Sequence, residues 1–169
     1  MMQLASPSTV RDFTLELATE VVEEFRGQPG ALIVALHKLQ ETFGYVDEAA
    51  MPMLAKLFNL SRAEVHGVTS FYHDFRRHKP GRYTVKVCQA EACQAMGSEQ
   101  LTAAIKQQLG CDFHETTHDG MFTLEPVYCL GNCACSPNVM IDKQTYGRVT
   151  DKSFKALTAA LAAKAAGAK

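Results

Sequence analysis

The sequence predicts an α+β fold, in which an N-terminal helical bundle precedes a smaller α/β domain. Up to residue 78, apolar residues recur at three- and four-residue spacing, as on the buried face of a helix. From residue 82 onward, short alternating segments are interleaved with helical ones, as in a sheet covered by helices. Between the two patterns lies Lys79-Pro80-Gly81, which is typical of a linker. We therefore divide the chain into a helical domain, residues 1–79, and an α/β domain, residues 80–169.

Four helices are predicted in the first domain, after a loose tail of residues 1–9. The turn 27–30 ends the first helix, Gly44 is a suitable C-cap for the second, and Asp47 can cap the third. Ser61 and Glu64 have the spacing of a capping box at the start of the fourth. The residues expected to face inward are, helix by helix, Phe13, Leu17, Val21 and Phe25; Leu32, Leu36, Leu39 and Phe43; Met51, Leu54, Leu57 and Phe58; and Val65, Val68, Phe71, Tyr72 and Phe75.

The second domain begins with a predicted strand over 82–87 that leads directly to Cys88. Its other predicted elements are a helix capped by Ser98 and ending at Gly110, an extended segment at 112–116, an Asp-Gly turn at 118–120, a strand over 121–127, a hairpin of 139–142 with 146–149, and a last helix that starts at Thr150 or Asp151 and frays over 164–169. Two pairs of cysteines follow strand ends, so we expect both pairs to meet at one edge of the fold.

The composition is that of a soluble globular protein, with 47% hydrophobic and 21% charged residues. A net charge of -1 provides no basic excess for phosphates, so nucleic acid is not an expected partner. The longest apolar runs, such as 31–36, are far shorter than the ~20 residues of a membrane helix, so no membrane insertion is expected. Residues 1–13 lack the apolar core of a signal peptide. A cytoplasmic protein with reduced cysteines is therefore expected.

The two cysteine pairs are the candidate functional residues: Cys88 and Cys93 are separated by four residues in one loop, and Cys129 and Cys133 are separated by three in another. Four thiolates suit zinc, iron or an iron–sulfur cluster. The wide and unequal gaps favour a [2Fe-2S] cluster over a zinc site, which prefers tighter turns. A zinc-stapled interaction module remains an alternative. A thiol oxidoreductase is disfavoured because its usual Cys-x-x-Cys motif is absent.

Two further cysteines lie outside these pairs. Cys111 follows Gly110 and is expected to pack as a small buried apolar residue. Cys135 lies two residues after Cys133, so a Cys129-x5-Cys135 pair is an alternative for the second ligand pair. Backbone N–H groups are the expected donors to the ligand sulfurs, with small residues such as Ala90, Ala92, Gly131 and Ala134 allowing close approach of the main chain.

Several segments together resemble one known family, the thioredoxin-like [2Fe-2S] subunits that sit beside an NADH-oxidising flavoprotein. The matching segments are Phe43-Gly44-Tyr45, residues 64–72, Val87-Cys88, Cys93, Gly97, residues 129–133 and Pro137. Within that family, residues 65–76 and 88–97 look most like the gamma subunit of soluble NAD-dependent formate dehydrogenase. The sequence departs from the family pattern at Ala134-Cys135 and at 143–146, where an Asn-Gly turn is usual.

The resemblance implies a thioredoxin-like [2Fe-2S] second domain in a non-catalytic electron-transfer subunit of an oxidoreductase complex. It implies Cys88, Cys93, Cys129 and Cys133 as the cluster ligands. The implied partners are a flavoprotein that binds FMN and NAD and a large formate dehydrogenase catalytic subunit with a molybdenum or tungsten cofactor and further iron–sulfur clusters. Equivalent subunits of respiratory NADH:quinone oxidoreductase or NAD-linked hydrogenase are the alternatives. The helical domain is expected to be a docking surface, a cap for the second domain, or both.

Overall fold

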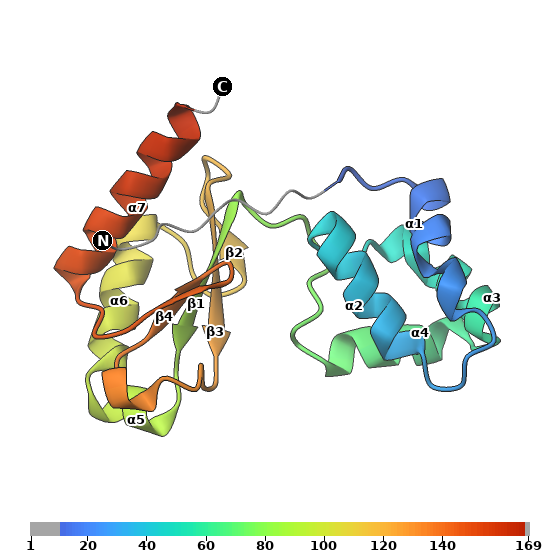
Figure 1. The fold of residues 1–169 in the computed structure, drawn as a ribbon, viewed down its shortest axis with the longest axis horizontal. Coiled ribbons are helices and arrows are strands. Elements are labelled where there is room, and N and C mark those ends of the chain that lie inside the picture. The colour runs from blue at the N-terminus through green and yellow to red at the C-terminus, as the bar shows by residue number, and fades with distance from the viewer. Residues whose placement is uncertain (1–10, 168–169) are drawn as a thin grey trace. The chain divides into compact units, whose positions relative to one another are not determined.

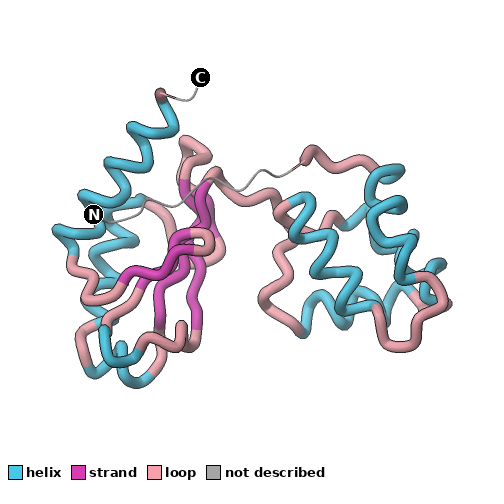
Figure 2. Tube along the Cα trace, in the orientation of Figure 1, coloured by secondary structure: helices cyan, strands magenta, loops and turns pink. Residues whose placement is uncertain are grey.

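The computed structural model describes residues 11–167, which form two compact units that meet in the sequence between Lys79 and Pro80 (Figure 1). Helices and loops make up the first unit, and the strands of the described residues all lie in the second (Figure 2). The predicted tail, residues 1–9, lies outside the part that the structure describes. Whether each unit is an independent domain, as the predicted boundaries imply, stays a prediction. No helix within residues 11–167 is both long and apolar enough to cross a membrane.

The first unit contains the predicted helices in the predicted order. Its elements are α1 (Leu15–Val22), the 3₁₀ turn η1 (Glu23–Phe25), α2 (Leu32–Phe43), the 3₁₀ turn η2 (Glu48–Ala50), α3 (Met51–Phe58) and α4 (Arg62–Phe71). Gly44 ends α2 with φ of 82°, the left-handed conformation that a glycine adopts without strain. The Asp47 carboxylate accepts from the Ala49 N–H at 2.8 Å and so caps η2 rather than α3.

Two of the predicted buried faces need correction. In α1, Ala18 and Val22 are fully buried, whereas the residues predicted to face inward from the first helix, Phe13, Leu17, Val21 and Phe25, are half-buried and pack against the same core. In α4, Val65 is buried as predicted, but Phe71 is 74% exposed and Tyr72 44% exposed. At 3.6 residues per turn, the residue above Val65 is Thr69, which is buried, whereas Phe71 lies well around the helix. The pattern predicted the helix correctly, but Phe71 lies on another side of α4, and Tyr72 is the C-cap residue with an extended backbone and so does not continue the helix face.

The capping box of α4 gives the first unit a defined pH dependence. The Ser61 N–H donates to Glu64 Oε2 at 2.8 Å, and the Glu64 N–H donates to Ser61 Oγ at 3.2 Å. The backbone and hydroxyl hydrogen bonds from Ser61 lower the pKa of Glu64. A lowered pKa in the folded state stabilises the protein above the ordinary pKa of glutamate, and this stabilisation is lost as the pH falls.

A Glu64→Gln variant tests this, because glutamine keeps the reciprocal hydrogen bond but has no carboxylate to titrate. We expect the unfolding free energies of the two proteins to differ most above the ordinary pKa of glutamate and to converge on acidification. Urea unfolding across the acidic pH range measures the difference. A difference that stays constant with pH would contradict the stated role of the ionised carboxylate.

The second unit is a five-stranded sheet in the order β2-β3-β1-β4-β5. Its elements are β1 (Tyr83–Cys88), α5 (Glu91–Ala95), α6 (Ser98–Leu109), β2 (Glu115–Thr116), β3 (Phe122–Val127), the 3₁₀ turn η3 (Cys133–Cys135), β4 (Val139–Ile141), β5 (Gln144–Tyr146) and α7 (Asp151–Ala166). β1 and β3 are parallel, and the other pairings are antiparallel. This arrangement confirms the α+β fold class.

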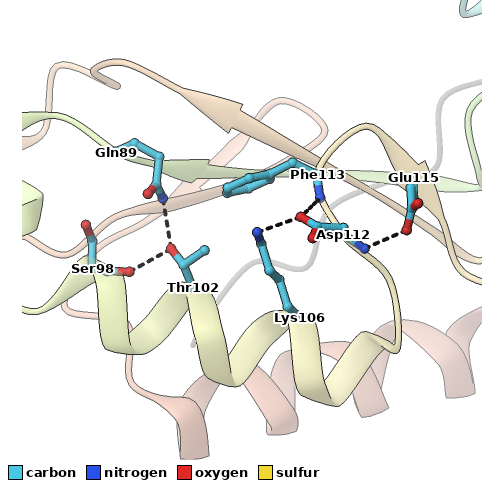
Figure 3. Close-up of polar contacts among 7 residues, drawn as sticks. All are labelled: Gln89, Ser98, Thr102, Lys106, Asp112, Phe113 and Glu115. Atoms are coloured by element: carbon cyan, nitrogen blue, oxygen red, sulfur yellow. Dashed lines mark hydrogen bonds and ion pairs between the residues drawn. The ribbon is translucent and has the colours of Figure 1, made fainter.

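One face of this sheet forms the core of the second unit. The alternation in β1 places Tyr83, Val85 and Val87 on that face, and all three are fully buried, as predicted. Helices α6 and α7 lie side by side against it (Figure 1) and contribute Ile105, Phe154 and other apolar residues. At the C-terminal end of α6, Lys106 Nζ lies 2.6 Å from Asp112 Oδ1 and 4.3 Å from the centre of the Phe113 ring (Figure 3). The helix is therefore fixed to both the sheet and the following segment.

Four details of the second unit differ from what the sequence predicted. Gly97, with φ of 87°, is the N-cap of α6, and Ser98 is its first residue, with a fully buried hydroxyl. The second hairpin strand is 144–146 rather than 146–149, because β4 and β5 are joined by the two-residue turn Asp142-Lys143. The short helix α5 was not predicted. The alanine-rich end of α7 remains helical through Ala166 instead of fraying from residue 164.

The N-cap of α7 provides a stability prediction for the second unit. Thr150 Oγ1 accepts from the Ser153 N–H at 3.2 Å, and Ser153 Oγ accepts from the Thr150 N–H at 2.9 Å. A Thr150→Ala substitution removes the side-chain acceptor and should lower the unfolding free energy by about 1 kcal/mol. Chemical denaturation checks this value, with the exposed mid-helix substitution Lys155→Ala as control. Equal losses in the two variants would mean that the cap does not stabilise α7.

Candidate metal centre

The two cysteine-containing loops leave the sheet at the same edge. β1 and β3 run parallel, with Cys88 opposite Val127, so both strands end side by side. The Gln89 N–H continues the ladder by donating to the Val127 carbonyl at 2.8 Å. Cys88 is therefore the last residue of one strand, and Cys129 follows the end of its neighbour by two residues. This arrangement confirms that the loops of both cysteine pairs start at one edge, as the sequence predicted.

The first loop is held in place by α5, which contains Cys93, and by the following helix, α6. That cysteine lies within α5, which begins three residues after the strand ends. Gln89 Nε2 donates to Thr102 Oγ1 at 2.8 Å, and Thr102 Oγ1 in turn donates to the Ser98 carbonyl at 2.6 Å (Figure 3). These bonds fix the start of the loop to α6, so Cys88 and Cys93 have defined positions.

The second loop turns sharply around its two cysteines. Cys129 has φ of 123° and Gly131 has φ of 74°, after which Cys133 begins η3. The Gly131 N–H donates to Cys129 Sγ at 3.3 Å. The backbone N–H groups of Ala90 and Leu130 act to lower the pKa of the Cys88 thiol, against the larger effect of burial. Main-chain N–H groups thus act on the sulfurs of Cys88 and Cys129, and two of these groups, those of Ala90 and Gly131, belong to the small residues that the sequence singled out.

The four thiols are arranged as two neighbouring pairs. Cys88 and Cys93 lie close enough for each thiol to shift the pKa of the other, and they are 2% and 1% exposed. Cys129 Sγ and Cys133 Sγ lie 3.8 Å apart, and both residues are exposed. Within residues 11–167, no three metal-ligating side chains gather around a single point. A binuclear cluster takes two thiolates on each of its irons, so two adjacent pairs fit such a group.

The surroundings of the buried thiols, Cys88 and Cys93, shift their pKa values in opposite directions. Burial alone would raise the pKa of the Cys93 thiol, but the neighbouring Cys88 thiol and the hydrogen bonds from Asn138 lower that pKa. Burial raises the pKa of Cys88, with the Ala90 N–H opposing it. In the exposed pair, the hydrogen bond with Cys129 raises the pKa of Cys133. Of the two buried thiols, Cys93 is therefore the one that more readily becomes a thiolate.

The two other cysteines have surroundings of a different kind. Cys111 is half-buried against the core of the second unit, and burial raises the pKa of its thiol. Cys135 is half-buried beside Gly147, where a Cβ added to the glycine would lie 2.7 Å from the Cys135 Cβ. These positions favour Cys133 over Cys135 as the partner of Cys129.

Sequence reasoning missed the side chains that contact Cys93. Cys93 Sγ donates to Ser136 Oγ at 3.4 Å, and Asn138 Nδ2 donates to Cys93 Sγ at 3.5 Å. Both contacts come from the second loop, more than forty residues further along the chain. The only signal in the sequence is the polar pair around Pro137, which directly follows the cysteines. Such long-range pairing is decided by the fold and not by local pattern.

Comparison with known proteins identifies the family. The Thioredoxin-like [2Fe-2S] ferredoxin family matches residues 18–162. The HndA subunit of the NADP-reducing hydrogenase from Solidesulfovibrio fructosivorans is 34% identical over 140 residues, covering 83% of this chain and 82% of the relative. The E subunit of the NADH-quinone oxidoreductase from Pseudomonas aeruginosa is 40% identical over 119 residues, covering 70% of this chain and 72% of the relative.

A solved structure shows the same fold at lower sequence similarity. The NAD+-reducing [NiFe]-hydrogenase in the H2-reduced state superposes with a TM-score of 0.67 at 22% identity, over 79% of this chain. This chain corresponds to only 22% of that hydrogenase chain. The family match covers most of the sequence, including both cysteine loops and most of the helical unit. The chain therefore belongs to the thioredoxin-like [2Fe-2S] ferredoxin family, which implies that it carries a [2Fe-2S] cluster.

Proposed function

We propose that this chain is an electron-transfer subunit in which Cys88, Cys93, Cys129 and Cys133 hold the [2Fe-2S] cluster. The proposal rests on one observation: the two pairs of thiols follow the ends of β1 and β3, which run parallel and end side by side. When bound, a cluster of this type accepts and releases one electron at a time. The chain itself provides the thiolates and surrounds them with N–H donors, which offset the negative charge of four sulfur ligands.

The unequal burial of the two pairs supports exchange of electrons with a partner. Cys88 and Cys93 are shielded from solvent, whereas Cys129 and Cys133 are exposed. Tyr128, which precedes Cys129, is 77% exposed. A partner protein can therefore approach the second loop closely. The buried Cys88 and Cys93 hold the part of the site that is shielded from solvent.

The host complex is the more specific part of the proposal. We place the chain beside a flavoprotein that binds FMN and NAD, in a cytoplasmic formate dehydrogenase whose large catalytic subunit holds a molybdenum or tungsten cofactor. The names of the relatives support a pyridine-nucleotide-linked complex in general. Support for formate dehydrogenase comes from residues 65–76 and 88–97, which look most like its gamma subunit.

Purification of the complex from its native host through an affinity tag on this chain tests the host assignment. We expect the complex to couple formate oxidation to NAD+ reduction and to contain molybdenum or tungsten. NADH should reduce the [2Fe-2S] cluster, and so produce its EPR signal, in the complex but not in the isolated chain. Hydrogen-dependent NAD+ reduction with bound nickel, or quinone reduction in a membrane fraction, would instead assign the chain to one of the two alternative hosts.

A further inference from the structure

Asn138 connects both ligand loops from a fully enclosed position. It precedes β4 and is 1% exposed. Its Nδ2 donates to the Asn132 carbonyl at 2.8 Å and to Cys93 Sγ at 3.5 Å, and its Oδ1 accepts from Asn132 Nδ2 at 2.9 Å. Its carbonyl accepts from the Cys88 N–H at 3.1 Å. One residue thus contacts the end of β1, the ligand in α5 and the loop between Cys129 and Cys133.

The orientation of the Asn138 amide is fixed by its partners. An amide side chain has two N–H donors and one carbonyl acceptor. The Asn132 side-chain donor occupies the carbonyl oxygen, and the Asn132 main-chain carbonyl takes one N–H. The other N–H is left to face the Cys93 sulfur. If the Asn138 amide were flipped, its N–H donors would face the N–H donors of the Asn132 side chain and its oxygen would face the Asn132 carbonyl oxygen. The unflipped orientation is therefore strongly preferred.

Ser136 also contacts Cys93, but in this contact the Cys93 thiol donates the hydrogen bond. The Ser136 hydroxyl has a single proton and donates it to the Cys133 carbonyl at 2.7 Å. In its contact with Ser136, the Cys93 thiol is the donor. A thiolate ligand has no proton to give, so the serine contact must rearrange when Cys93 ligates a metal. The Asn138 donation requires no rearrangement and becomes a charge-assisted hydrogen bond.

We propose that Asn138 is a positioning residue that joins the two ligand loops and raises the reduction potential of the cluster by donating an N–H to the Cys93 sulfur. Reduction adds one electron without forming or breaking a bond in the chain, and it increases the negative charge on the ligand sulfurs. A fixed donor then stabilises the reduced state more than the oxidised state. This inference rests on the ligand set of the proposed function.

An Asn138→Asp variant is the direct test, because aspartate keeps the shape and the acceptor but replaces the donor with an oxygen. It also adds a negative charge, and the uncharged second variant separates the effect of that charge from the loss of the donor. We expect about two irons per chain, as in the parent protein, and a reduction equilibrium at least tenfold less favourable, which is about 59 mV for one electron. Redox titration followed by EPR measures this shift. Asn132→Ala is the second variant: it leaves Asn138 in place but removes one of the two groups that orient its amide, the Asn132 side chain, while the main-chain carbonyl of residue 132 remains. A smaller shift in the same direction is expected.

Thr158→Val is the matched control for general destabilisation. Thr158 is 6% exposed in α7, and its hydroxyl accepts from Gln108 Nε2 of α6 at 2.7 Å and donates within α7 itself, away from both ligand loops. The control should melt at a lower temperature with an unchanged potential and EPR spectrum. An unchanged potential in Asn132→Ala and in Asn138→Asp would overturn the inference and leave Asn138 a purely structural residue. A parent chain without iron would overturn the ligand set itself, a distinct result.

Discussion

Replacing any one of Cys88, Cys93, Cys129 or Cys133 by Ser is expected to remove the [2Fe-2S] cluster or to perturb it strongly. A thiolate is a soft ligand that suits iron–sulfur clusters, whereas a serine hydroxyl is hard and stays protonated near neutral pH. Each variant also leaves one iron with a single thiolate from its neighbouring pair. Iron and sulfide analysis, together with the visible absorption of the purified chain, measures the loss.

The remaining two cysteines supply matched controls for these substitutions. Cys111→Ser changes a half-buried thiol against the core, and Cys135→Ser changes a thiol two residues from a ligand. Both controls are expected to retain the cluster. A normal cluster in Cys133→Ser together with its loss in Cys135→Ser would reverse the ligand assignment in the second loop.

Gly147→Ala is expected to cause the second largest effect, because the second ligand loop packs directly on this glycine. An added Cβ would lie 2.7 Å from the Cys135 Cβ and 2.9 Å from both the Cys135 carbonyl oxygen and Asn132 Nδ2. The neighbouring Arg148 N–H donates to that carbonyl at 2.6 Å, so the two segments cannot separate freely. Overpacking of this kind costs about 1–3 kcal/mol.

Urea unfolding measures the stability lost in Gly147→Ala, and iron analysis shows whether the displaced loop still binds the cluster. We expect both stability and iron content to fall. Gly167→Ala is the control, because its added Cβ would meet no atom closer than 3.7 Å. Equal stability of the two variants would show that the ligand loop does not depend on close packing at Gly147.

The sequence predicted those parts of the fold that depend on local pattern. The alternation of Tyr83, Val85 and Val87 predicted β1 and its buried face, and the Ser61–Glu64 spacing predicted the start of α4. The position of each cysteine pair after a strand predicted one shared edge, because both strand ends are marked in the sequence. Each of these predictions depends only on residues that are close together in the sequence.

Predictions failed where packing between distant segments decides the outcome. Phe71 is apolar, yet it is exposed because it lies well around the helix from the buried Val65 and Thr69. Ser98 has the chemistry of an N-cap, but Gly97 adopts the left-handed conformation there, and the serine is inside the helix. The contacts of Ser136 and Asn138 with Cys93 join residues more than forty positions apart, and no local pattern predicts them.

The central claim is that four cysteines of this chain hold one binuclear cluster, and EPR of the isolated chain tests it most directly. The chain is expressed anaerobically, analysed for iron, sulfide and zinc, and examined before and after reduction with dithionite. We predict about two irons and two sulfides per chain, with a rhombic signal that appears only after reduction. Stoichiometric zinc without iron, sulfide or a signal would contradict the claim and indicate a structural zinc module.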